Sequence, residues 1–325
     1  MRKAVMSILV AMAAFSNGVS AQSSNYPSKP VAIMVPYPAG AASDITARAL
    51  QGPIAKALSG TVITENLGGA NGAIGAAKVL NAPADGAYIF QGSPNELILA
   101  GLTNKAVKYK PQDFEMLAPV AISPYILVTR GDLPVASIDE LVALGKKAQT
   151  PLAYGSGGVG SMIHLVGAAF GSRSQIALTH VPYKGGAPLL AELAGGQIDF
   201  AFLPMQANYL DLQREGRLKI IATLEPKRLE ALPQVPSVNE SKTMNGFNYT
   251  IWTAYMAKKG TPPDIMEKLR SAIYAGMQDA TARKTLEAQS KIIFAEKSSQ
   301  ENTLFYKTEI ERLSALVKSI DYQAE

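Results

Sequence analysis

The chain lacks cysteine altogether and has only two histidines among its 325 residues. Without cysteine it cannot form disulfides, bind zinc through thiolates or use a cysteine nucleophile. Two histidines also leave little basis for a metal site built on imidazoles. These absences exclude much of enzyme chemistry, and we expect neither a metal nor a cofactor.

Charged side chains are sparse as well, at 18% of residues against 47% hydrophobic ones. A chain this apolar does not match a disordered protein, and its length is sufficient for two domains. The net charge of +5 falls to +3 when Arg2 and Lys3, in a predicted signal peptide, are removed. Such a weak positive charge gives little reason to expect a nucleic-acid partner, and we expect none.

The N-terminus has the pattern of a secretory signal. Arg2 and Lys3 precede an apolar run from Ala4 to Phe15, and Val19-Ser20-Ala21 follows as a small-x-small cleavage site. The apolar run is shorter than the ~20 residues that span a bilayer. We predict that residues 1–21 are a signal peptide, cleaved near Ala21.

The mature chain alternates strands with helices, which predicts an α/β fold. Val31–Val35 is a continuous apolar run typical of a strand buried on both faces. The same pattern begins again at Tyr125, and residues 249–257 read as a strand that crosses back. We predict two lobes, residues 22–123 with 251–325 and residues 124–250, joined by two crossing strands around a cleft, the usual place for a ligand.

One helix is expected to be irregular. An apolar stripe of Ile45, Ala49, Ile54 and Leu58 predicts a helix after the turn at Gly40. Gly52-Pro53 interrupts it, and Pro53 lacks the amide hydrogen that a continuous helix uses. We therefore expect this helix to be kinked or split there.

Two glycine-rich turns precede predicted helices. Gly155-x-Gly157-x-x-Gly160 matches the dinucleotide fingerprint. However, no Asp or Glu occurs between Glu140 and Glu192 to hold a ribose, which argues against nucleotide binding. A glycine-rich helix start still offers free amides and the positive end of the helix dipole. Because the turn at Gly40–Ser43 offers a second such start, we expect a carboxylate or other small anion to bind between the two.

Several polar residues in these turns have two interpretations. His164 either hydrogen-bonds a ligand or packs against a strand, and His180 is expected to be structural. Asp44 is expected to accept backbone amides at a helix start rather than act as a base. A secreted hydrolase using Ser156 or Ser161 with His164 is the alternative function, although the chain has no Gly-x-Ser-x-Gly elbow.

The chain resembles a known family over essentially its whole mature length. The residues that carry the resemblance are Tyr26-Pro-x-Lys-Pro30, Val35-Pro-Tyr-Pro-Ala-Gly40-x-x-x-Asp44, Glu65-Asn66, Gly69-Ala-Asn-Gly72, Ala84-Asp85-Gly86, Tyr183-Lys-Gly-Gly186, Gly195-Gly196-Gln197-x-Asp199 and Leu232-Pro-x-Val-Pro236. Together they are similar to the Bug-type, TctC-like solute receptors, the substrate-binding proteins of tripartite tricarboxylate transporters.

The resemblance implies a periplasmic-binding-protein type II fold that closes around its ligand by hinges near Ser123 and residues 247–252. It implies a monomeric periplasmic receptor, not an enzyme, that delivers a di- or tricarboxylate or an aromatic acid to the membrane subunits of the transporter. A signalling protein is the alternative partner. Backbone groups and two ordered waters would hold the carboxylate, from residues 36–44 and 155–161. The expected ligand-binding residues are Tyr37, Pro38, Ala39, Gly40, Ala41, Ser43, Asp44, Asn95, Gly155, Ser156, Gly157, Gly158, Val159, Gly160, Ser161, His164, Tyr183 and Pro204.

The first of these loops departs from the family pattern. Ala39-Gly40-Ala41 stands where the family usually has Pro-Gly-Gly. The Cβ of Ala41 takes up space that a glycine leaves free. We therefore expect the ligand shape or the water positions to differ here.

Overall fold

The computed structural model describes residues 26–324. The predicted signal peptide, residues 1–21, lies outside this range. Within it, no helix combines the length and the apolar character that crossing a membrane requires.

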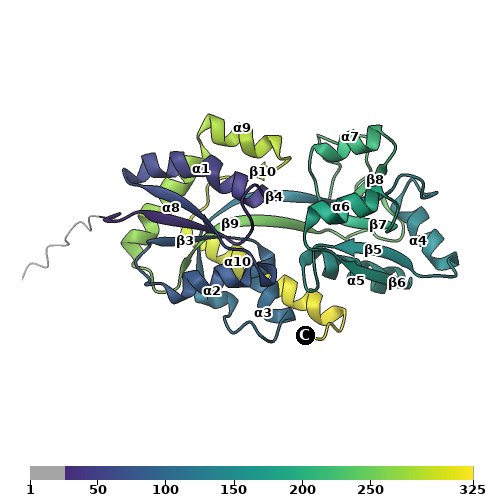
Figure 1. Ribbon diagram of the computed structural model, residues 1–325, viewed down its shortest axis with the longest axis horizontal. Helices are drawn as coiled ribbons and strands as arrows, with labels where there is room; N and C mark the ends of the chain where they lie inside the picture. The colour runs from purple at the N-terminus through teal and green to yellow at the C-terminus, as the bar shows by residue number, and fades with distance from the viewer. Residues whose placement is uncertain (1–25, 325) are drawn as a thin grey trace, which may run out of the picture.

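The first lobe begins with a parallel arrangement of strands and helices (Figure 1). Strand β1 lies between β2 and β3 and is parallel to both, and all five of its residues are buried, which confirms the predicted buried strand. The elements are β1 (Val31–Val35), α1 (Ala42–Leu58), β2 (Val62–Asn66), η1 (Ala70–Gly72), α2 (Ala73–Asn81), β3 (Tyr88–Gly92), η2 (Asn95–Leu99), α3 (Ala100–Thr103) and η3 (Pro111–Asp113).

One long strand joins the two lobes. Strand β4 (Phe114–Arg130) pairs with β9 (Thr250–Lys258) as far as Pro124. From Tyr125 onward it pairs instead with β7 (Phe200–Pro204) and β8 (Leu218–Thr223). Figure 1 shows β4 and β9 side by side between the lobes. The fold is therefore two-lobed with crossing strands, as predicted.

The second lobe also alternates strands with helices along the chain. Strand β5 lies between β6 and β7 and is parallel to both, so the glycine-rich loop again follows an inner strand. Ser137 caps the first helix of this lobe by accepting a hydrogen bond from the amide of Glu140. The remaining elements are α4 (Ile138–Lys147), β5 (Leu152–Ser156), α5 (Met162–Ser174), β6 (Leu178–Pro182), α6 (Gly186–Ala194), α7 (Asn208–Arg214) and η4 (Val238–Glu240).

The C-terminal part returns to the first lobe and ends against the second. It contains the helices α8 (Pro263–Met277), α9 (Ala280–Ala288) and α10 (Ser299–Ser319), and the short strand β10 (Ile292–Ile293), which is antiparallel to β4. Helices α1 and α8 pack on one face of the first sheet. Beyond α10, the ring of Tyr322 lies 5.6 Å from that of His164 in α5.

Of the two expectations for Gly52-Pro53, a kink or a split of α1, the split is wrong, and the kink stays a prediction. A single helix runs from Ala42 to Leu58 with Pro53 inside it. Proline still removes one helical hydrogen bond, but the helix packs closely on α8 at this point. A Cβ added at Gly276 of α8 would lie 3.0 Å from Ile54 Cγ1 and 3.5 Å from Pro53 Cβ. Tertiary packing thus offsets the local cost.

Candidate ligand-binding site

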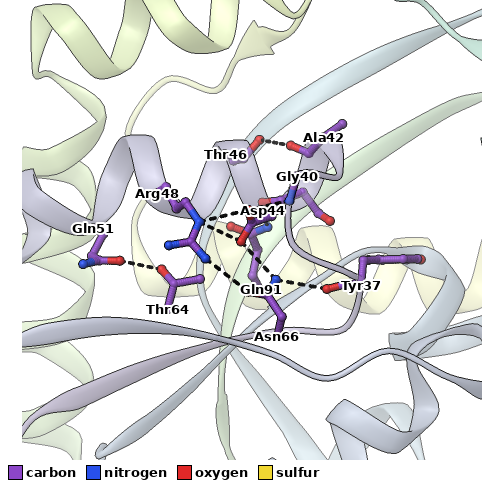
Figure 2. Close-up of polar contacts among 11 residues, drawn as sticks. Tyr37, Gly40, Ala42, Asp44, Thr46, Arg48, Gln51, Thr64, Asn66 and Gln91 are labelled. Atoms are coloured by element: carbon purple, nitrogen blue, oxygen red, sulfur yellow. Dashed lines mark hydrogen bonds and ion pairs between the residues drawn. The ribbon is translucent and has the colours of Figure 1, made fainter.

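The loop after β1 is held in place by the buried carboxylate of Asp44 (Figure 2). Its Oδ2 accepts a hydrogen bond of 2.8 Å from the backbone amide of Gly40. Its Oδ1 accepts another of 3.0 Å from Asn66 Nδ2, and Arg48 Nε lies 2.9 Å from Oδ2. Asp44 thus accepts a backbone amide at a helix start, as expected, and its carboxylate is occupied by the protein's own donors.

Asn66 holds the other end of the loop, at Tyr37, by a hydrogen bond. Its Nδ2 also donates to the carbonyl of Tyr37, at 3.0 Å. Burial acts to raise the pKa of Asp44, but the bonds from Arg48, Gly40 and Asn66 hold that pKa below its ordinary value. The loop between Tyr37 and Gly40 is therefore fixed at both ends by an ionised, hydrogen-bonded network.

The helix that follows this loop has no side-chain cap. Ala41 is the N-cap residue of α1, in an extended conformation, and alanine has no oxygen to cap the first amides. Ala41 has a φ of −67°, so an alanine fits there without backbone strain, whereas the positive φ of +82° falls on Gly40. The first turn of α1 consequently presents amides and the positive end of the helix dipole to an anion.

The glycine-rich loop of the second lobe is organised differently. Ser161 caps α5 by accepting a hydrogen bond from the amide of His164, and it donates one of 2.7 Å to the carbonyl of Gly158. The amide of Gly160 donates to His164 Nδ1, at 3.0 Å. Unlike α1, helix α5 therefore begins with amides that protein groups already satisfy.

The two histidines stack behind this loop. The rings of His164 and His180 are 3.7 Å apart and nearly parallel. Burial lowers the pKa of each to about 4, and for His164 the neighbouring His180 adds to the effect. Both rings are therefore neutral at pH 7 and support the loop without adding charge to it.

The serines predicted for a hydrolase have other partners. Ser156 Oγ lies 2.6 Å from Nε2 of His180, not from the ring of His164, and its side chain is buried. Ser161 bonds to backbone groups. No hydrogen bond between either hydroxyl and the ring of His164 occurs within residues 26–324. The arrangement fits a loop support better than an accessible nucleophile.

The two lobes touch directly at the glycine-rich loop. Asn95 Oδ1 in the first lobe accepts a hydrogen bond of 2.8 Å from the amide of Met162 in α5. Asn71 Nδ2 donates to the carbonyl of Val159, at 3.0 Å. Asn95 Nδ2 also lies 3.5 Å from the hydroxyl of Tyr37. Asn95 thus connects the loop after β1 with the start of α5.

Other predicted residues lie at the edges of these loops. Pro38 and Ala39 are exposed on the first loop, and Val159 is 38% exposed on the second. Tyr183 follows β6, and its amide donates to the carbonyl of Ser156, at 2.9 Å. Pro204 ends β7, the strand next to β5. Their contact with a ligand stays a prediction.

Several residues at these loops have partners that their local sequence does not indicate. Asn66 and Asn71 lie in motifs that carry the family resemblance. Only the fold shows that Asn66 bonds to Tyr37 and Asp44, and that Asn71 bonds to Val159 of the second lobe. Glu96 is buried beside Ser93, whose hydroxyl donates to its Oε2 at 2.7 Å. Burial is the main cause that raises the pKa of Glu96 to about 7. A glutamate next to Asn95 has no sequence signal that would predict this burial.

Two cavities on the first lobe do not coincide with these loops. One, of about 640 Å³, lies between α1 and α8 and includes Tyr26 and Lys268 in its lining. The other, of about 600 Å³, lies beside α10 and includes Phe114 and Tyr306. Neither is lined by a predicted ligand-binding residue.

Comparison with known proteins agrees with the fold and with the resemblance. The chain is 31% identical over 290 residues to BugT of Bordetella pertussis, covering 88% of this chain and 87% of BugT. The structure of the periplasmic binding protein BugD matches 92% of this chain and all of BugD, with 30% identity and a TM-score of 0.80.

Two similar structures contain organic acids. A Rhodopseudomonas palustris protein solved with adipate is 26% identical, with a TM-score of 0.82, over 92% of this chain and 100% of that one. MatC from the same species, solved with malate, is 25% identical, with a TM-score of 0.79, over 90% and 100%. The family model described as "Tripartite tricarboxylate transporter family receptor" matches residues 46–322. The chain therefore belongs to this family of periplasmic solute receptors.

Proposed function

We propose that this protein is a periplasmic receptor that binds a small organic acid and delivers it to the membrane subunits of a tripartite tricarboxylate transporter. The carboxylate binds between the start of α1 in the first lobe and the loop of residues 155–161 in the second. The observation that carries the proposal is the uncapped N-terminus of α1, presented by a loop that Asp44 and Asn66 hold in place. Free amides at the positive end of a helix dipole favour an anion.

The similar structures support an acid as the ligand. Adipate and malate, found in two of them, both carry two carboxylates. Backbone amides with bridging waters accommodate carboxylates of different shapes, because a bridging water is enthalpically nearly as good as a direct bond. This chain has an alanine at position 41 in the loop, so we expect its preferred acid to differ from those of relatives with glycine there.

Closure of the lobes completes the site. The contacts of Asn71 and Asn95 with the second lobe form only when the two lobes approach each other. A ligand that contacts both loops binds the closed arrangement more tightly and shifts the population toward it. The crossing strands β4 and β9 provide the hinge.

Thermal unfolding of the exported protein with a panel of acids tests the proposal. The panel contains adipate, malate, succinate, citrate and benzoate, with adipamide as the uncharged control. A binding acid raises the melting temperature, and 100-fold excess over Kd stabilises the folded state by about 2.7 kcal/mol. No shift with any acid, combined with no ligand in native mass spectra of the purified protein, would contradict the proposal.

A second experiment separates a transporter from a signalling partner. Uptake of the radiolabelled acid is measured in cells that lack this gene and in cells that lack the membrane subunits. Loss of uptake in both strains, restored by the missing gene, is the expected result. Normal uptake in both, with a lost transcriptional response to the acid, would assign the protein to a sensor instead.

A further inference from the structure

Helix α10 extends from the first lobe to the second. Figure 1 shows it leaving the first lobe and ending beside α5, and the two helices are in contact. Of the three apolar clusters in residues 26–324, two each lie within one lobe, whereas the third contains residues of both lobes and of α10. Helix α10 therefore belongs to the packing of both lobes. Its side chains buried in this shared cluster are Tyr306, Leu313, Leu316 and Val317.

The middle of α10 is fixed to a strand that crosses between the lobes. The indole Nε1 of Trp252 in β9 donates a hydrogen bond of 2.7 Å to Oε2 of Glu309, which is buried. Arg312 Nε donates to Oε1 of the same carboxylate, at 2.8 Å. Trp252 itself pairs with Ile122 of β4 in the sheet. These charge-assisted bonds hold α10 against the crossing strands.

The turn that ends α10 places Tyr322 against the second lobe. Asp321 has a positive φ of +48°, and its amide donates to the carbonyl of Lys318. The amide of Tyr322 donates to the carbonyl of Val317. These are the two hydrogen bonds of a Schellman motif, which closes a helix with a left-handed residue. The ring of Tyr322 thereby has a defined place, 5.6 Å from the ring of His164 and at 76° to it.

His164 connects this contact with the glycine-rich loop. Its Nδ1 accepts the hydrogen bond of 3.0 Å from the amide of Gly160. Such a bond needs the ring nitrogen to point at the amide, so it depends on how the ring is oriented. The ring of His180 lies parallel to it, 3.7 Å away, and its Nε2 lies 2.6 Å from Ser156 Oγ. The rings of His180 and Tyr322 therefore both limit how His164 can turn.

We propose that Tyr322 positions the glycine-rich loop for ligand binding, by fixing the ring of His164 that accepts the amide of Gly160. The inference rests on the proposed function and adds a positioning residue to it. A helix anchored at the crossing strands sets the shape of the ligand loop in the second lobe. Because the same helix packs in both lobes, the arrangement of the lobes and the shape of the loop are coupled.

Three variants test this role with the acid that stabilises the wild-type protein most in the panel, or with adipate and malate if several do. Tyr322→Ala removes the ring, and Tyr322→Phe keeps it. Tyr88→Ala is the matched control, because Tyr88 is also a half-buried tyrosine packed against the shared cluster, and it contacts Lys78 and Glu65 of the first lobe. Affinity is measured by isothermal titration calorimetry. The melting temperature and the hydrogen exchange of the Gly160 amide, by NMR, are measured without ligand.

We expect Tyr322→Ala to weaken acid binding roughly 2- to 10-fold, the range that corresponds to loss of an aromatic pair. We also expect it to speed up exchange at the Gly160 amide, because the acceptor ring is no longer held. Tyr322→Phe should match the wild type in both measurements, since it keeps the ring that contacts His164. Tyr88→Ala should lower the melting temperature and change neither the affinity nor the exchange at Gly160.

A double-mutant cycle with His164→Asn shows whether Tyr322 acts through His164. Asparagine keeps a side-chain acceptor but has no ring for Tyr322 to contact. In this background Tyr322→Ala should cause no further loss of affinity. If the two losses instead add, Tyr322 does not act through His164 and the inference is overturned.

The outcomes separate this inference from the proposed function. If the wild type binds an acid and Tyr322→Ala lowers only the melting temperature, Tyr322 has a structural role alone, and the receptor function stands. If the wild type binds no acid, the proposed function fails, and the exchange of the Gly160 amide still decides whether Tyr322 holds the loop. Unchanged exchange at Gly160 in Tyr322→Ala refutes the inference in either case.

Discussion

The side-chain oxygen of Asn95 accepts a hydrogen bond from the backbone amide of Met162, across the boundary between the lobes. Asn95 thereby acts on the first turn of a helix in the other lobe, 67 positions away in sequence. Asn71 makes the second such contact, 88 positions from its partner Val159. These two asparagines hold the lobes together at the glycine-rich loop without any charged group.

Replacing Asn71 or Asn95 by alanine should weaken ligand binding. Each change removes a hydrogen bond of the closed arrangement, worth about 0.5–1.5 kcal/mol, or roughly 2- to 10-fold in Kd. The radius of gyration without ligand, measured by small-angle X-ray scattering, should increase. Asn104→Ala, which removes only a local bond to the amide of Ala106, should change neither value. Equal effects of all three changes would argue against a specific role in closure.

Gly160→Ala should impair closure more strongly. Gly160 has a φ of +75°, and a Cβ there would lie 2.4 Å from Thr103 Oγ1 in the first lobe. The hydroxyl of Thr103 is bonded to the carbonyl of Leu99, which limits its movement. We expect a loss of affinity of about tenfold or more, from an overlap costing about 1–3 kcal/mol. The free protein should still unfold cooperatively.

Gly52→Ala is the control for that substitution. Gly52 lies inside α1, outside both loops, a Cβ there would meet no atom within 4 Å, and Gly52 has no positive φ. Its affinity should stay close to that of the wild type, as measured by calorimetry. If Gly160→Ala binds as well as Gly52→Ala, ligand binding does not need the close approach of Gly160 to Thr103.

Asp44→Ala should destabilise the protein and weaken binding together. The change leaves the amide of Gly40, Asn66 and Arg48 without their common acceptor. Because Asp44 is buried, we expect a loss of about 2–4 kcal/mol in the free energy of unfolding, measured in urea. Arg48→Met should cost less than about 1 kcal/mol, since the Arg48 side chain is 53% exposed. The opposite order would show that Arg48, and not Asp44, holds the loop.

Glu96→Gln should stabilise the protein increasingly as the pH rises from 4.5 to about 7, and most at neutral and alkaline pH. Burial is the main cause that raises the pKa of Glu96 from 4.5 to about 7, so folding favours its protonated form. The stability that this carboxyl group contributes is fully present below pH 4.5 and is lost as the pH rises through 7. Glutamine mimics the protonated form. The variant should therefore gain up to about 3 kcal/mol at pH 8 and little at pH 4.5.

Denaturant unfolding at several pH values measures this difference. Glu230→Gln, at an exposed position, should show no comparable dependence on pH. A gain for Glu96→Gln that is equal at pH 4.5 and pH 8 would indicate a packing effect rather than removal of a buried charge.

Local patterns predicted most of the elements. The run Val31–Val35 forms β1 with the predicted bounds, and the strand predicted over residues 249–257 is β9, Thr250–Lys258. Ser137 and Ser161 cap helices through contacts within three residues, so these contacts depend only on residues that are close together in the chain. The predicted split of α1 at Gly52-Pro53 fails because a contact distant in sequence decides the outcome. Proline disfavours a continuous helix locally, and the packing of α1 on α8, which no local pattern contains, outweighs that preference.

The sequence by itself determined the α/β alternation, the two glycine-rich helix starts and the family, because these depend on residues close together in the chain. Only the tertiary structure decided which helix start remains uncapped, which asparagines join the lobes, that Glu96 is buried and that Tyr322 lies against His164. These properties depend on partners dozens or hundreds of positions away. Burial and hydrogen bonding act through space, so the chain must be folded before the chemistry of this site is defined.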